Sequence, residues 1–193
     1  MFSHLPVQVS LLNQIESTTD EMMHKYFTEI STKSSTLSEY FKSGEAREAH
    51  LSGYIGWDGF LLEPDIYLSE PFLEAINEQF PIRFGGIIKM APRMVYKWHQ
   101  DRDRKGGINM LLTANDSSHC LFTAHDSEET LQLEVSELYY KEDTFYLFNT
   151  QERHMVLNLD KPRYLFSIEF EDHPPYGALV KWANKNGWTD ESK

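Results

Sequence analysis

The sequence predicts a mainly β fold with flanking helices, a double-stranded β-helix of the jelly-roll (cupin-like) type. The first observation is a series of short runs rich in β-branched and aromatic residues, at 82–90, 94–99, 108–113, 120–124, 131–138, 144–148, 155–159 and 164–171. The second is the turn chemistry between these runs, in Ala91-Pro92, Lys105-Gly106-Gly107, Asn115-Asp116-Ser117 and Lys161-Pro162. About eight short strands at this spacing are typical of a jelly roll or a related barrel-like sandwich.

The first 81 residues are predicted to be mostly helical and to pack on the outside of the barrel. From Val9 to about Ser31, apolar residues recur near helical spacing, and Thr18-Thr19-Asp20 either interrupts this helix or caps a second one. A further helix is predicted with Ser69 as its N-cap and Pro71 in its first turn, running to about Phe80.

An amphipathic C-terminal piece follows Pro174-Pro175. We therefore expect a single domain over residues 1–193, with the helical part at 1–81, the jelly-roll core at 82–171 and a C-terminal tail at 172–193.

Composition and charge limit the classes of protein to which the chain can belong. Its 193 residues, 40% of them hydrophobic, can bury a sizeable core. The 30 acidic against 18 basic residues give a net charge of −12, which argues against nucleic acid as a partner. The single cysteine, Cys120, fits a reducing compartment. Residues 1–10 resemble neither a signal peptide nor a membrane span, so we expect a soluble, cytoplasmic protein without a membrane partner.

A candidate metal site lies in the run Trp98-His99-Gln100-Asp101. In an extended strand, side chains two residues apart point to the same face, so His99 and Asp101 can reach one ion together. The distant His154 would supply a second imidazole. Two imidazoles and one carboxylate form the facial triad that holds Fe(II) with open coordination positions. The net positive charge of such a site suits an anionic, chelating co-substrate.

Arg163, nine residues after His154, is the candidate anchor for the far end of that co-substrate. In its strand, the bulky apolar residues occupy one face, whereas Arg163 and Ser167 occupy the other. If helices cover the apolar face, Arg163 points into the barrel and can bind a carboxylate through two hydrogen bonds. If the apolar face lines the barrel instead, Arg163 is a solvated surface residue. The strand pattern alone leaves both alternatives open.

Neighbouring residues are expected to have structural roles. His119 and His125 flank a strand near the site and are expected to be structural or surface histidines. Tyr96 has the opposite strand parity to His99 and is expected to pack elsewhere. The basic run around Arg104 is either a solvated loop or a binding surface for an acidic substrate.

Two stretches of the chain resemble the iron(II)/2-oxoglutarate-dependent oxygenases. The run from Tyr96 to Lys105, followed by the strand Ile108–Leu112, is similar to their metal-binding region. The run from Phe145 to His154, continued to Arg163, is similar to their distal histidine and 2-oxoglutarate arginine. Within that superfamily, the likeness is to the aspartyl/asparaginyl β-hydroxylase-like group and covers roughly residues 82 to 171. The animal members of that group lack the carboxylate ligand that Asp101 offers here.

The resemblance implies that His99, Asp101 and His154 are the Fe(II) ligands and that Arg163 pairs with the distal carboxylate of 2-oxoglutarate. Asn109 would either bind the proximal carboxylate of the co-substrate or satisfy a neighbouring backbone group. The implied reaction uses 2-oxoglutarate and O2, releases succinate and CO2, and hydroxylates an aliphatic carbon. The expected substrate is an amino-acid side chain, either free or in a peptide or protein.

Two other hypotheses remain open at this point. One is a cupin-like metal protein without 2-oxoglutarate chemistry, which would have no need of Arg163. The other is a catalytically inactive binding module built on the same barrel.

Overall fold

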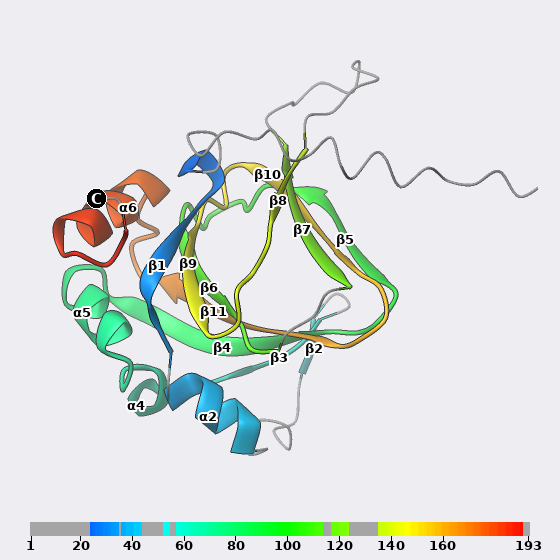
Figure 1. Ribbon diagram of the computed structural model, residues 1–193, viewed down its shortest axis with the longest axis horizontal. Coiled ribbons are helices and arrows are strands. Elements are labelled where there is room, and N and C mark those ends of the chain that lie inside the picture. The colour runs from blue at the N-terminus through cyan, green and yellow to red at the C-terminus, as the bar shows by residue number, and fades with distance from the viewer. Residues whose placement is uncertain are drawn as a thin grey trace, which may run out of the picture.

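The computed structural model describes residues 24–34, 36–43, 52–54, 57–113, 117–123 and 135–190. Its strands form two antiparallel sheets, ordered β1-β9-β6-β11-β4-β3-β2 and β5-β10-β7-β8. Figure 1 shows the two sheets as opposite walls of a barrel, with the helices outside the larger sheet. This arrangement confirms the predicted mainly β fold with flanking helices.

The strands from β4 onward lie at the predicted places, whereas β1, β2 and β3 fall within the part of the chain that was predicted to be mostly helical. The larger sheet contains β1 (Phe27–Lys33), β2 (Ser52–Tyr54), β3 (Trp57–Leu61), β4 (Ile82–Met90), β6 (Gly107–Leu111), β9 (Thr144–Phe148) and β11 (Arg163–Phe170). The smaller sheet contains β5 (Met94–His99), β7 (Ser118–Thr123), β8 (Val135–Leu138) and β10 (Arg153–Asn158). Strands β4, β5 and β9 match the predictions residue for residue. The first half of the strand predicted at 131–138 lies outside the described residues.

The described helices are α2 (Thr36–Ser43), α4 (Pro64–Tyr67), α5 (Pro71–Gln79) and α6 (Tyr176–Lys185). Pro71 occupies the first turn of α5 as predicted, but the N-cap is Glu70 rather than Ser69. The buried Glu70 carboxylate accepts hydrogen bonds from the Ser34 hydroxyl (2.5 Å) and the Leu37 backbone N–H (2.9 Å). It therefore joins the start of α2 to the start of α5. None of the described helices is long and apolar enough to cross a membrane.

The helix predicted from Val9 to Ser31 is wrong over its last part. Residues 27–33 form β1, which pairs antiparallel with β9 at the edge of the larger sheet, Phe27 opposite Phe148. The run contains the β-branched residues Thr28, Ile30 and Thr32, and β9 offers it an open edge, so tertiary pairing overrides the helical periodicity. The part of that helix before residue 24 lies outside the described residues.

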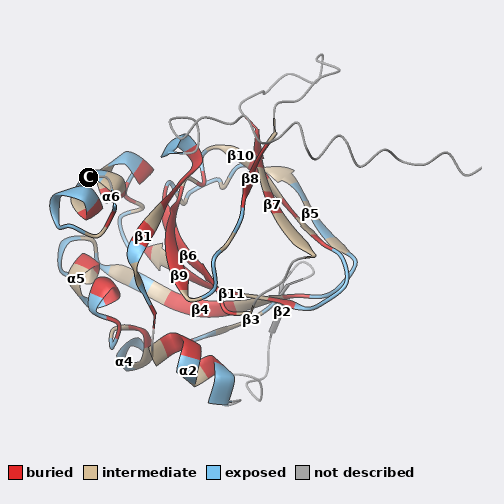
Figure 2. Ribbon diagram, in the orientation of Figure 1, coloured by how far each residue is buried: buried red, intermediate tan, exposed pale blue. Residues whose placement is uncertain are grey.

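The main core lies between the larger sheet and the helices. Phe166 and Ile168 of β11 are fully buried there together with Phe72 of α5 and Leu179 of α6. Figure 2 shows the buried residues concentrated on β6 and β9, in the middle of the same sheet. Because the helices cover the apolar face of β11, its other face lines the barrel. Arg163 is therefore an interior residue, 2% exposed, and the surface alternative is excluded.

Candidate metal centre

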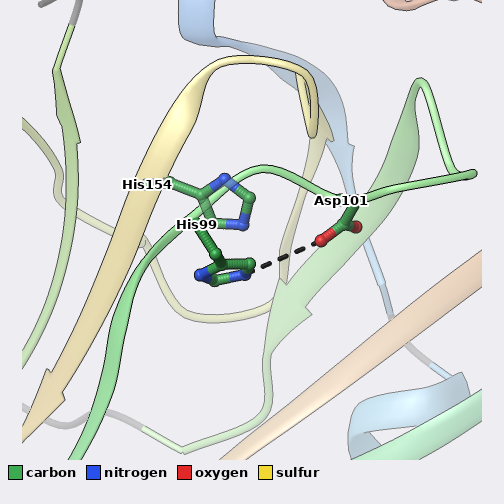
Figure 3. Close-up of side chains that lie close together, drawn as sticks. All are labelled: His99, Asp101 and His154. Carbon is green, nitrogen blue, oxygen red and sulfur yellow. Dashed lines mark ion pairs between the residues drawn. The ribbon is translucent and has the colours of Figure 1, made fainter. Parts of the chain in front are cut away.

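His99 and His154 are cross-strand neighbours. Strands β5 and β10 pair antiparallel with these two residues opposite each other, and their ring centroids are 4.1 Å apart. Asp101 approaches from the loop after β5, and one ligand atom of each of the three residues lies within 4.8 Å of the others. Figure 3 shows the three side chains turned toward one another. The structure thus brings together the three residues that the sequence proposed as ligands.

Asp101 reaches this position from outside the strand, because β5 ends at His99. Its backbone N–H donates to the carbonyl oxygen of Thr150 (3.0 Å). The side-chain amide of Gln151 donates to the carbonyl oxygens of Asp101 (3.0 Å) and Arg104 (2.9 Å). The loop after β5 is therefore fastened to the turn before β10, and these bonds, rather than strand parity, place the carboxylate beside the histidines.

Each histidine presents the same nitrogen to the centre. Nδ1 of His99 lies 2.7 Å from the carbonyl oxygen of Lys97, and Nδ1 of His154 lies 2.8 Å from that of Glu152. A carbonyl oxygen only accepts hydrogen bonds, so Nδ1 carries the proton in both rings. The lone pair on Nε2 is then left for a metal ion, and the hydrogen bond holds each ring in place.

The ionisation of His154 also suits metal binding. Burial lowers its pKa to about 4, and the neighbouring His99 contributes in the same direction. A metal ligand must be the neutral imidazole. His154 is therefore ready to coordinate at neutral pH without first losing a proton.

The two oxygens of Asp101 have different partners. Oδ1 lies 3.6 Å from Nε2 of His99, whereas Oδ2 accepts a hydrogen bond from Nε of Arg104 at 2.8 Å. The donor set, two neutral imidazoles and one carboxylate oxygen, suits Fe(II) with further positions open.

The centre lies on the wall of a cavity of about 1000 Å³ inside the barrel. Such a volume is at the upper end of the usual range for small-molecule sites. Residues of both sheets line it, among them Tyr96, His99, Asp101, Arg104, Asn109, Tyr140, His154, Arg163 and Ser167.

Arg163 has no anionic partner in this cavity among the described residues. No described carboxylate lies within ion-pair distance of its guanidinium, and the buried Glu137 pairs with His119 instead (2.7 Å). Burial raises the pKa of Cys120 to about 12 and also raises the pKa of Tyr140, so both stay neutral at pH 7. A buried cation that lacks a counter-charge fits a carboxylate ligand.

Tyr140 lies beside Arg163 in the cavity wall, and the sequence analysis did not identify it as a site residue. The centre of its ring lies 5.4 Å from the guanidinium carbon of Arg163. Its buried hydroxyl has no hydrogen-bond partner within the described part of the chain. No sequence signal distinguishes this residue, because it lies outside the strands, after β8.

Asn109 and Ser167 face each other across β6 and β11 and line the cavity. The Ser167 hydroxyl donates to Oδ1 of Asn109 at 2.8 Å. Asn109 is thus in the expected cavity, but its carbonyl oxygen is bonded to a side chain rather than to a neighbouring backbone group.

Tyr96 lines the cavity, contrary to the expectation from parity. Its ring centroid lies 3.9 Å from that of His99. The pairing of β5 with β10 is irregular between His154 and Val156, where three steps along β5 match two along β10. Such a bulge inserts one residue and resets the alternation of side chains. His119 lies apart from the metal centre, and His125 lies outside the described residues.

Comparisons of the fold identify several similar solved structures. A prolyl-4-hydroxylase from Pseudomonas putida has a TM-score of 0.54 at 13% identity, covering 83% of this chain and 96% of its own. The viral collagen prolyl hydroxylase of Paramecium Bursaria Chlorella virus-1, in a 2-oxoglutarate complex, has a TM-score of 0.51 at 13% identity, with coverages of 74% and 93%. HygX from Streptomyces hygroscopicus, with nickel, 2-oxoglutarate and hygromycin B bound, has a TM-score of 0.54 at 13% identity, with coverages of 78% and 86%.

These similarities confirm the predicted double-stranded β-helix, the fold of the 2-oxoglutarate/Fe(II) oxygenases. No protein-family model and no curated protein sequence matches the chain.

Proposed function

We propose that the protein is an Fe(II)/2-oxoglutarate-dependent dioxygenase that hydroxylates an aliphatic carbon. His99, Asp101 and His154 would hold the iron, and Arg163 would bind the distal carboxylate of 2-oxoglutarate. The observation that carries the proposal is the presence of both features in one cavity: a three-residue metal centre and a buried guanidinium that has no counter-charge among the described residues. A metal protein that binds no dicarboxylate would not need the buried guanidinium of Arg163.

When bound, iron and 2-oxoglutarate supply the oxidising chemistry, in which O2 is consumed and succinate and CO2 are released. The protein's own residues bind and orient. Arg163 neutralises one end of the dicarboxylate at a buried position, where a charge-assisted hydrogen bond is strong. The Tyr140 hydroxyl lies beside Arg163 and is available to donate to the same carboxylate. No side chain has to act as a nucleophile or as a strong base.

Asn109 is proposed as a further contact of the co-substrate. Its side chain lies in the cavity wall and is 4% exposed, on the strand next to that of Arg163. Because Oδ1 accepts from Ser167, the amide N–H group is the part of the side chain that would donate to a carboxylate oxygen.

The proposed substrate is an amino-acid side chain, in a peptide or free. Two of the similar structures are prolyl hydroxylases, and the sequence resembles the aspartyl/asparaginyl β-hydroxylase-like group. The cavity also has an apolar part that is open to solvent, lined by Leu61, which is 69% exposed, and by Phe84 and Ile88. An apolar surface beside the reacting centre suits the aliphatic part of such a side chain.

The test is an anaerobic titration of metal-free protein, first with Fe(II) and then with 2-oxoglutarate. Chelation of Fe(II) by a 2-oxo acid gives a visible charge-transfer absorption, which we expect in the wild type. Arg163→Met should weaken 2-oxoglutarate binding at least about 30-fold, because truncating one partner of a buried charge pair costs about 2 kcal/mol or more. Arg93→Met, which removes an exposed arginine, is the matched control.

Three outcomes would contradict the proposal at different points. Iron binding without the absorption band would favour a cupin-like metal protein. A band without turnover of 2-oxoglutarate, tested with peptides and free amino acids, would favour an inactive binding module. Absence of iron binding would mean that the three ligand residues do not act together.

A further inference from the structure

We propose that Arg104 is a positioning residue that holds the carboxylate of Asp101 in the orientation needed for metal binding. The inference rests on the proposed function, since it takes Asp101 as a metal ligand. Arg104 belongs to the loop between β5 and β6, yet its side chain is only 23% exposed and forms part of the cavity wall. It is therefore not part of a solvated loop, which was one of the two alternatives for this basic run.

The guanidinium of Arg104 connects the metal centre to the larger sheet. Its Nε donates to Oδ2 of Asp101 at 2.8 Å, and its Nη1 donates to the hydroxyl of Ser167 at 3.1 Å. The Ser167 hydroxyl has a single proton, which it donates to Oδ1 of Asn109 at 2.8 Å. Donation thus runs in one direction from Arg104 through Ser167 to Asn109, and each of these three bonds uses a different hydrogen.

The position of Arg104 is restricted at both ends of the residue. Its carbonyl oxygen accepts hydrogen bonds from the Thr150 hydroxyl and from the side-chain amide of Gln151 (2.9 Å). At the other end, the guanidinium lies against Gly107, where a Cβ atom would be only 3.2 Å from Nη1. The absence of a side chain at Gly107 makes room for the guanidinium beside β6.

This arrangement assigns separate tasks to the two oxygens of Asp101. Oδ2 is occupied by Arg104, so Oδ1 alone is directed toward the histidines. A carboxylate that offers one oxygen occupies one coordination position and leaves more positions for a chelating co-substrate. Without Arg104, the Asp101 side chain could rotate away or bind through both oxygens.

A second effect of Arg104 opposes the first. Its positive charge repels a metal ion, and this repulsion alone would make metal binding tighter when Arg104 is removed. We expect the positioning effect to be larger, because the guanidinium contacts the oxygen that faces away from the centre and its charge is paired with Asp101 itself. Hydrogen-bond partners of metal ligands typically contribute 10- to 100-fold to metal affinity.

The test measures Co(II) binding to metal-free protein by calorimetry and by the visible absorption of the bound ion. Arg104→Met should raise the Kd for Co(II) about 10- to 100-fold and change the absorption of bound Co(II), which reports coordination geometry. Arg104→Lys keeps the positive charge but has one donor nitrogen in place of three, so we expect it to recover part of the affinity and of the wild-type spectrum. Arg102→Met removes an exposed arginine of the same loop and should resemble the wild type.

The outcomes separate this inference from the proposed function. If the wild type binds Co(II) and Arg104→Met binds it equally or more tightly with the same spectrum, Arg104 does not position Asp101, and the proposed function stands. If the wild type binds no Co(II), the proposed function fails together with this inference. Thermal unfolding of the metal-free variants checks folding, and Arg104→Lys carries the test alone if Arg104→Met does not fold.

Discussion

His99 and His154 lie opposite each other on neighbouring antiparallel strands, with ring centroids 4.1 Å apart, although 55 positions separate them in the chain. Each ring is held by a hydrogen bond from Nδ1 to a carbonyl oxygen two residues earlier. Strand pairing therefore supplies the distance between the two imidazoles, and the local backbone supplies their orientation. Several measurable consequences arise from this geometry and from the cavity beside it.

Removing His154 should abolish tight metal binding. His154→Ala leaves one imidazole and one carboxylate, which is one ligand fewer than the facial triad requires. The Kd for Fe(II) or Co(II), measured by calorimetry under argon, should rise by at least about 100-fold. His119→Ala removes a histidine that pairs with Glu137 outside the centre and should leave the Kd unchanged. Equal losses in both variants would contradict the assignment.

Removing the Tyr140 hydroxyl should weaken co-substrate binding without destabilising the protein. The hydroxyl is buried beside Asn109 and Cys120 but forms no hydrogen bond of good geometry with a described residue, so Tyr140→Phe should cost little stability. A hydrogen bond to a carboxylate contributes about 1.5 to 3 kcal/mol, so the Kd for 2-oxoglutarate should rise roughly 10- to 100-fold. Titration of the Fe(II) protein and thermal unfolding of the metal-free protein measure the two effects. An unchanged Kd would show that the hydroxyl does not contact the co-substrate.

The stability of the metal-free protein should fall between pH 6.5 and pH 4 because of His154. Burial and the neighbouring His99 lower its pKa from 6.5 to about 4, so in this window the unfolded chain binds a proton that the folded protein does not. The contribution is complete above about pH 6.5 and is lost as the pH falls through 4. Its size is on the order of 3 kcal/mol.

Chemical denaturation at several pH values, with a chelator present, measures this dependence. His154→Gln has no titrating group at this position and should show a smaller slope of unfolding free energy against pH in the same window. An identical slope in the wild type and the variant would contradict the lowered pKa of His154.

Glu70 is not part of the metal centre, but its removal should lower the free energy of unfolding. Glu70→Ala leaves the buried Ser34 hydroxyl and the Leu37 N–H without their acceptor. We expect a loss of about 2 to 4 kcal/mol in the free energy of unfolding. Glu74→Ala, an exposed position in the first turn of the same helix, should cost less than about 1 kcal/mol. Similar costs at the two positions would show that the Glu70 contacts contribute little.

The strands could be predicted well because alternation and turn residues are local properties of the chain. Strands β4, β5 and β9 begin and end at the predicted residues, each next to a proline, glycine or polar turn. Strand β1 could not be predicted in this way. Its residues have mixed periodicity, and they become a strand because the edge of β9 is available to pair with them.

Tyr96 and Tyr140, two of the aromatic residues that line the cavity, show a different limit of strand parity. Tyr96 was assigned to the wrong face because a bulge in β5 shifts the alternation between Tyr96 and His99. Tyr140 lies beyond the end of β8, so the alternation of side chains along a strand does not predict which way it points. A bulge and a loop position both depend on the partner strand and on packing, which a single sequence does not encode locally.

The residues of the candidate site could be named from the chain alone, because His99, Asp101, His154 and Arg163 have a recognisable spacing within strand-forming runs. The direction of Arg163 required the tertiary structure. The same alternation is compatible with either face pointing inward, and the packing of Phe72 and Leu179 against the apolar face of β11 turns Arg163 into the barrel. The contact of Arg104 with Asp101 likewise arises only when the loop after β5 is tied to the turn before β10. Spacing along a chain records which side chains are present, whereas long-range packing decides which of them meet.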